Sequence, residues 1–103
     1  EGAGTNPEEL IGAAHAGCFS MAFANGLAQA GHEPESIRTT ANVHLEKGDE
    51  GFGITRIVLE CTGKVPGLDE ETFQKHAQEA KVGCPVSKAL SATPIELEAT
   101  LES

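Results

Sequence analysis

The chain has 103 residues, a length that supports one domain and not two. Its aromatic residues are four phenylalanines, so the core must be built mainly from Ala, Leu, Ile and Val, and so small a core favours oligomerisation. Sixteen acidic side chains against seven basic ones give a formal charge of −9, which repels phosphate backbones and anionic membrane surfaces. We therefore expect a single domain over residues 1–103, with neither nucleic acid nor a membrane as its partner.

The first predicted element is a long helix that begins at Pro7. Asn6 is a good N-cap, Pro7 fits the first helical position, and Glu9 stands at the third position of a capping box. The helix is expected to end by Gly31. The segment 10–31 has no Asp, Glu, Lys or Arg and is long enough to span a bilayer. Its polar residues and glycines nevertheless favour a central helix buried inside the protein.

Two strands are predicted next, and they form a hairpin. Apolar and polar residues alternate from Ile37 to Glu46, which indicates a half-buried strand. One face of this strand carries Ile37, Thr39, Ala41, Val43 and Leu45, and the other face carries Arg38, Thr40, Asn42, His44 and Glu46. The segment Gly48–Gly51 predicts a turn, and the run from Gly53 to Val65 is the antiparallel partner. Cys61 lies on the apolar side of this second strand, so we interpret it as a core residue.

The second half of the chain predicts a helix, a short helix and a strand. Asp69 caps the longer helix, and Pro85 begins a short one that ends at Ala89. The inward face of the longer helix is expected to carry Phe73, Ala77, Ala80 and Cys84. The inward face of the last strand is expected to carry Ile95, Leu97, Ala99 and Leu101. The order α-β-β-α-β predicts an α+β fold.

Three cysteines, Cys18, Cys61 and Cys84, are an odd number, and no secretory signal peptide precedes them. A reducing cytoplasm is therefore the expected location. Cys18 lies in mid-helix among small residues and Cys84 lies where one helix ends and another begins, and we interpret them as a redox pair. His15 is one turn before Cys18 and as an imidazolium would favour its thiolate. The alternative is a packed, hydrogen-bonded histidine.

Several segments resemble the OsmC/Ohr family of osmotically inducible protein C and organic hydroperoxide resistance proteins, which are cysteine-based peroxidases. The segments are Asn6-Pro7-Glu8-Glu9-Leu10, His15-Ala16-Gly17-Cys18, Val65-Pro66-Gly67 and Gly83-Cys84-Pro85-Val86-Ser87. The two that contain cysteine are more similar to the OsmC branch than to the Ohr branch. The resemblance implies an OsmC-like fold, in which a long central helix packs on antiparallel strands, and an intertwined homodimer with active sites at the interface.

The resemblance also implies roles for three residues. Cys18 matches the peroxidatic cysteine, Cys84 the resolving cysteine, and Glu8 the anchor for an arginine that polarises the thiolate. The family carries that arginine in an N-terminal β segment before the long helix. Arg38 and Arg56 follow the helix, so neither matches it. We therefore expect this chain to lack the family's N-terminal strands together with the arginine.

The implied activity is that of a thiol-dependent peroxidase acting on organic hydroperoxides, with hydrogen peroxide as a further candidate substrate. Peroxide would oxidise Cys18 to a sulfenic acid, which condenses with Cys84 to a disulfide. This requires the two Cα atoms to come within about 7 Å. An external dithiol, of lipoyl type by the resemblance, would reopen the disulfide. No metal or organic cofactor is expected.

Two other interpretations stay open. One is a metal-binding module that uses Cys18, Cys84 and histidines such as His15 or His76. It is disfavoured because structural zinc sites use closely spaced ligand pairs, and the sequence has none. The other is a non-catalytic dimeric fragment that keeps the fold without an activated thiol.

Overall fold

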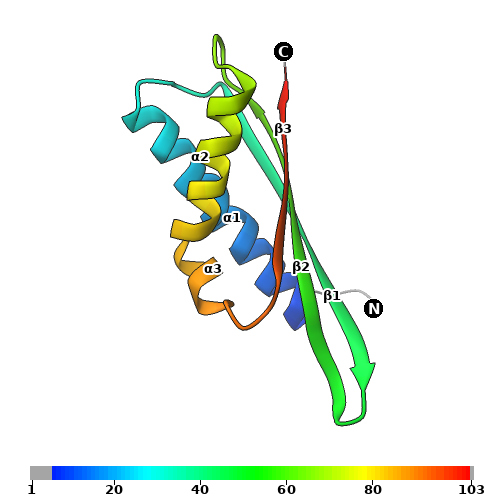
Figure 1. The fold of residues 1–103 in the computed structure, drawn as a ribbon. Helices are drawn as coiled ribbons and strands as arrows, with labels where there is room; N and C mark the ends of the chain where they lie inside the picture. The colour runs from blue at the N-terminus through cyan, green and yellow to red at the C-terminus, as the bar shows by residue number, and fades with distance from the viewer. Residues whose placement is uncertain (1–5, 103) are drawn as a thin grey trace.

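The computed structural model describes residues 6–102 as three helices and a three-stranded sheet. The elements in chain order are α1 (Pro7–Gln29), β1 (Ser36–Gly48), β2 (Gly51–Lys64), α2 (Glu70–Gly83), α3 (Pro85–Ala89) and β3 (Ile95–Glu102). All three helices lie on one side of the sheet (Figure 1). The predicted α+β class and element order are confirmed, with α3 as the short helix expected after Pro85.

The sheet has the order β1-β2-β3, with β2 in the centre. β1 and β2 pair antiparallel through the turn between Gly48 and Gly51. β3 runs parallel to β2, with Ile57 opposite Ile95. The antiparallel arrangement expected for the strands therefore holds for β1 and β2 only, and the sheet is mixed. The reason is the connection: α2 and α3 carry the chain back to the middle of β2, where β3 starts opposite Ile57, and parallel neighbours require such a crossover.

Helix α1 begins where its cap predicts. The Glu9 backbone N–H donates to Asn6 Oδ1 at 2.9 Å, which satisfies one of the free donors of the first turn. By length and composition α1 is apolar enough to cross a membrane, but in this fold it packs against β1, α2 and α3. It is buried along one face only, because Leu10 and Met21 are 61% and 75% exposed. The helix expected to be central and buried is therefore only partly buried within residues 6–102. The buried side chains of α1 larger than glycine are His15, Phe19, Phe23 and Leu27.

The core joins α1, α2 and β2. The ring centroid of Phe23 lies 5.6 Å from that of Phe19 and 5.2 Å from that of Phe73, so aromatic contacts link the two long helices. Each such fully buried side chain contributes about 1.5–3 kcal/mol relative to an exposed one. Cys61 is 2% exposed and belongs to this core. Its interpretation as a core residue is confirmed.

The β1–β2 hairpin extends past the helices (Figure 1). A β-bulge interrupts it, since His44 pairs with Arg56 but Leu45 pairs with Ile54. Beyond the bulge none of the three described helices covers the inner face (Figure 1), and Leu45 is 42% exposed. Leu45, at the end of the predicted apolar face, therefore lies outside the core. The predicted alternation of apolar and polar residues is present in β1, but the helices cover only part of the length of this strand.

Candidate active site

Two thiols from distant parts of the chain lie in contact. Cys18 is in the middle of α1, Cys84 separates α2 from α3, and their Sγ atoms are 2.9 Å apart, with both cysteines free. Cys84 is fully buried, whereas Cys18 is partly exposed. A small molecule that approaches from solvent therefore meets Cys18 first.

The break between α2 and α3 positions Cys84. Its backbone N–H donates to the Ala80 carbonyl at 2.9 Å, which closes the last turn of α2. Cys84 itself has extended backbone angles, φ −63° and ψ 122°. Pro85 follows, and because proline has no N–H it cannot continue α2 but can begin α3. The change of direction leaves the Cys84 sulfur against α1.

His15 lies one turn before Cys18 and is fully buried. Its Nε2 atom is 2.7 Å from Ser87 Oγ, on α3. Burial lowers the pKa of His15 below 6.5, so the ring is neutral near pH 7. Of the two roles open from the sequence, the structure supports the packed, hydrogen-bonded histidine and not the imidazolium. The other ring nitrogen, Nδ1, has no hydrogen-bond partner among residues 6–102.

The two thiols differ in acidity. Burial raises the pKa of Cys18, and its hydrogen bond with Cys84 raises it further. Burial also raises the pKa of Cys84, but hydrogen bonds from Cys18, Ser87 and Val86 outweigh it, and the pKa falls below its ordinary value. Within the described residues the thiolate is therefore favoured at Cys84. Attack by Cys18 on a peroxide requires the opposite, and so requires a cation beside Cys18.

Glu8 does not lie beside the thiols. It is half-buried in the first turn of α1, ten residues before Cys18, which is about 15 Å along the helix axis. With Glu9 it lines a cavity of about 690 Å³, whose other walls come from the three strands and which neither thiol lines. Among residues 6–102 no cation forms an ion pair with Glu8.

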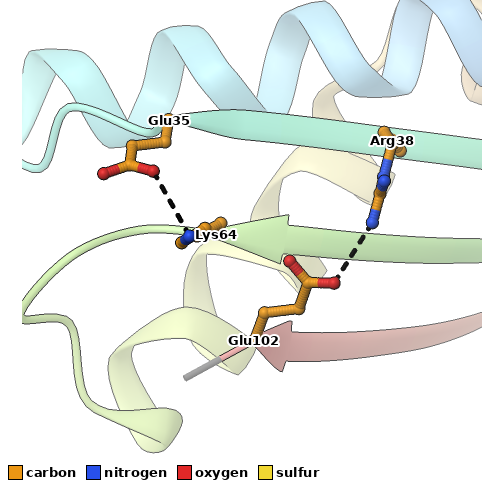
Figure 2. Close-up of polar contacts among 4 residues, drawn as sticks. All are labelled: Glu35, Arg38, Lys64 and Glu102. Carbon is orange, nitrogen blue, oxygen red and sulfur yellow. Dashed lines mark hydrogen bonds and ion pairs between the residues drawn. The ribbon is translucent and has the colours of Figure 1, made fainter.

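Both arginines of the chain pair elsewhere. Arg38 Nη2 is 3.2 Å from Glu102 Oε2, a pair that spans the sheet from β1 to β3 (Figure 2). Arg56 pairs with Glu96 at 3.4 Å. Arg38 and Arg56 alternate with the inward residues of their strands, so they lie on the sheet face away from the helices that carry the thiols. Neither supplies the cation that Cys18 needs.

The metal-binding interpretation finds no support in the geometry. Residues 6–102 contain no group of three or more His, Cys, Asp or Glu side chains that could hold a metal ion. His76 lies on α2, where its Nδ1 atom is 3.8 Å from Glu79 Oε1 and its ring is 6.2 Å from the ring of His32. His15 hydrogen-bonds to Ser87 instead of joining the two sulfur atoms as a ligand.

Ser87 is the site residue that the sequence analysis missed. It is 6% exposed and hydrogen-bonds to His15. One pattern could have indicated it, because a hydroxyl three residues after Cys84 in the first turn of α3 is close enough to reach the cysteine. The contact with His15 spans 72 residues and has no local pattern.

Comparisons with known proteins identify the family of this chain. The family model described as OsmC-like protein matches residues 1–99. Over 100 residues the chain is 57% identical to peroxiredoxin OsmC of Escherichia coli (strain K12), a match that covers 97% of this chain and 69% of that protein. It is 36% identical over 89 residues to the organic hydroperoxide resistance protein of Xanthomonas axonopodis pv. citri (strain 306), with coverage of 85% and 61%.

Solved structures give the same picture. The organic hydroperoxide resistance protein OhrB of Bacillus subtilis superposes with a TM-score of 0.73 at 28% identity, covering 97% of this chain and 72% of that one. An OsmC-like protein from Mycoplasma pneumoniae shares the fold, with a TM-score of 0.83 at 21% identity and coverage of 98% and 74%. The chain belongs to the OsmC-like protein family.

Proposed function

We propose that this chain carries the redox centre of a thiol-dependent peroxidase that reduces organic hydroperoxides. The observation that carries the proposal is the 2.9 Å contact between Sγ of the partly exposed Cys18 and Sγ of the buried Cys84. The relatives named peroxiredoxin OsmC and organic hydroperoxide resistance protein support a peroxide-related function. The residue roles below are inferred from the geometry and the family resemblance.

In the first step the Cys18 thiolate attacks the peroxide. A sulfur–oxygen bond forms as the O–O bond breaks, and the departing alkoxide takes a proton and leaves as an alcohol. Cys18 becomes a sulfenic acid. Its exposure makes it the accessible sulfur of the pair, and the small, apolar residues beside it favour organic substrates over hydrogen peroxide.

In the second step Cys84 resolves the sulfenic acid. An S–S bond forms, the S–O bond of Cys18 breaks, and water leaves. The thiols are already in contact, so the bond forms with little movement of α1 or α2. An external dithiol then reopens the disulfide by exchange, and we expect a lipoyl-type reductant.

Activation of Cys18 needs a cation that the described residues do not provide. We propose that Glu8 anchors an activating arginine, which is neither Arg38 nor Arg56 and is therefore not part of this sequence. An arginine that binds Glu8 and Cys18 at once can bridge only about two hydrogen-bond lengths between them. Within one chain, however, Glu8 and Cys18 are roughly 15 Å apart along α1. A homodimer resolves this difficulty, since Glu8 of one copy can serve Cys18 of the other.

The first test is oxidation of the reduced protein by one equivalent of cumene hydroperoxide, followed by intact and peptide mass spectrometry. We expect a rapid disulfide between Cys18 and Cys84. Slow oxidation, or oxidation spread over all three cysteines, would contradict the proposal.

Serine variants then separate the roles. Cys18→Ser should abolish peroxide consumption, and Cys84→Ser should allow one turnover that stops at the sulfenic acid. Cys61→Ser is the matched control, because Cys61 is a buried core thiol that is not part of the pair, and it should leave the oxidation product unchanged. Circular dichroism checks that all three are folded. Equal losses in the three variants would indicate general destabilisation.

A second candidate is a non-catalytic dimeric scaffold, and the raised pKa of Cys18 favours it. The rate of Cys18 alkylation as a function of pH, measured on the Cys61→Ser, Cys84→Ser protein, distinguishes the two. A Cys18 pKa below that of a free thiol supports the peroxidase. A pKa at or above the free value supports the scaffold.

A further inference from the structure

We propose that His15 and Ser87 form a positioning relay for the resolving thiol, in which the imidazole orients the Ser87 hydroxyl and this hydroxyl donates to the Cys84 sulfur. The inference rests on the proposed function only in that Cys84 acts there as the resolving cysteine. Neither His15 nor Ser87 is proposed to touch the peroxide. They act through Cys84.

Three buried side chains from three elements meet at this point. His15 from α1 and Ser87 from α3 are 0% and 6% exposed, and Cys84 at the α2–α3 junction is 0% exposed. His15 Nε2 lies 2.7 Å from Ser87 Oγ. With so little access to water, each polar atom depends on its protein partners for hydrogen bonding. The orientation of one group therefore determines that of the next.

The unpaired nitrogen of His15 fixes the direction of the relay. A neutral imidazole carries one hydrogen, on Nδ1 or on Nε2. On Nδ1 it would be a buried N–H donor with no acceptor among residues 6–102, whereas an unpaired lone pair at that position is less costly. The hydrogen therefore lies on Nε2, which donates to Ser87 Oγ. The hydroxyl accepts this bond and is free to donate its own hydrogen.

The acceptor for that hydrogen is the Cys84 sulfur. Cys84 directly precedes α3, and Ser87 is three residues further on, in the first turn. The Ser87 hydroxyl and the backbone N–H groups of Val86 and Ser87 are placed to hydrogen-bond a thiolate at Cys84. In the thiol form, Cys84 donates to Cys18. The site thus supplies hydrogen-bond donors that stabilise the Cys84 thiolate once Cys84 has lost its proton.

The remaining titratable groups near this point are few. Those within about one turn of Cys84 or Cys18 are His15 on α1, Lys81 on α2 and Lys88 on α3. Lys81 Nζ donates to the Ile95 carbonyl at 3.1 Å. Both lysines stay in place in every variant below, so differences between variants isolate the relay.

The relay assists both halves of the proposed cycle. In resolution, Cys84 loses its proton and attacks the Cys18 sulfenic sulfur. The S–S bond forms, the S–O bond breaks, and hydroxide leaves and is protonated to water. In reduction, a thiolate of the external dithiol attacks the Cys18 sulfur, the S–S bond breaks, and Cys84 leaves as a thiolate. Donors aimed at Cys84 stabilise the same thiolate in both steps.

The pKa of Cys84 tests the relay directly. In the full chain with Cys18→Ser and Cys61→Ser, Cys84 is the one remaining thiol, and its ultraviolet thiolate absorbance gives the pKa. Ser87→Ala should lower the thiolate fraction by about tenfold at pH values below the pKa, the equivalent of about one pKa unit. Ser87→Thr keeps a hydroxyl and should preserve the pKa. A folded Ser87→Ala protein with an unchanged Cys84 pKa would overturn the proposal.

Variants of His15 test the hydrogen bond from the imidazole to the Ser87 hydroxyl. His15→Leu removes the donor to Ser87 and should raise the Cys84 pKa, whereas His15→Gln places an amide N–H near the position of Nε2 and should restore it. Equal Cys84 pKa values in folded His15→Leu and parent protein would also overturn the relay.

One further measurement needs no substitution in the relay, so it still tests the proposal if the variants fail to fold. Nitrogen-15 NMR of the imidazole in the unmodified chain reports the tautomer. We expect a neutral ring with the hydrogen on Nε2, and a hydrogen on Nδ1 would refute the proposed direction. None of these measurements uses peroxide. If the protein does not react with peroxide but the variants show the expected changes in the Cys84 pKa, the proposed function is rejected and the relay is retained.

Discussion

Replacement of Gly63 by alanine tests how closely α2 packs on the sheet. Gly63 is buried in β2, opposite Ile37 on β1. A Cβ atom there would lie 2.8 Å from Phe73 Cε1, 3.2 Å from Phe73 Cζ and 3.0 Å from Ile37 Cδ1. The end of the Ile37 side chain can move. The Phe73 ring is fully buried, with its centroid 5.2 Å from that of Phe23, so it cannot move without disturbing the contact between α1 and α2.

The expected cost follows from this contact. Overpacking a close-fitted core costs about 1–3 kcal/mol. Alanine restricts the unfolded chain more than glycine does, which offsets about 0.4–1 kcal/mol of this cost. We therefore expect Gly63→Ala to lower the free energy of unfolding by roughly 1–2 kcal/mol. In a domain of this size that lowers the melting temperature by about 4–16 °C. Gly53 is the matched control, because it lies in the same strand with an ordinary φ and with no atom within 4 Å of its Cβ position.

Urea unfolding followed by circular dichroism measures both variants against the parent chain. Gly53→Ala should be neutral or slightly stabilising, and Gly63→Ala should be the less stable of the two by more than about 1 kcal/mol. Equal stability of the two variants would refute the argument, since it would mean that Phe73 relaxes away from the sheet at no cost.

Three further predictions concern pH, a helix cap and a surface ion pair. Because burial lowers the pKa of folded His15 below 6.5, the unfolded state binds more protons, and the free energy of unfolding should fall as the pH drops below about 6.5, by at most about 1.4 kcal/mol per pH unit. Urea titrations from about pH 7 to about pH 5 measure this slope, which His15→Gln should reduce. Asn6→Ala removes the side-chain acceptor of the Glu9 N–H and should cost about 1 kcal/mol in the same assay, and no loss would argue against the cap. Glu102→Gln breaks the pair with Arg38, whose side chains are 42% and 68% exposed, and should change stability by less than about 1 kcal/mol because solvent screens the pair.

The element boundaries could be predicted because their causes are local. A cap or a proline acts on backbone groups within three or four residues, and Asn6, Asp69 and Pro85 mark the starts of the helices α1, α2 and α3. The inward face of β3 was predictable for the same reason, since alternation along one strand needs no knowledge of its neighbours.

What could not be predicted depends on contacts between distant segments. The direction of β3 is determined by where α2 and α3 return the chain, and the exposure of Leu45 by where the cover of helices ends. The contact between Cys18 and Cys84 spans 66 residues, and from the sequence it rested on family resemblance. His15 was identified as a candidate, but its partner Ser87 lies on an element that the sequence does not place beside α1.

The separation of Cys18 and Cys84 along the chain has a thermodynamic consequence. A covalent bond between them would close a loop of 66 residues, from the middle of α1 to the junction between α2 and α3. In the chain-entropy description, a cross-link over such a loop restricts the unfolded ensemble enough to raise the free energy of unfolding by about 4 kcal/mol. The oxidised protein should therefore withstand heat better than the reduced one. Oxidation would then stabilise the folded state through the disulfide, and reduction of the disulfide would remove that stabilisation.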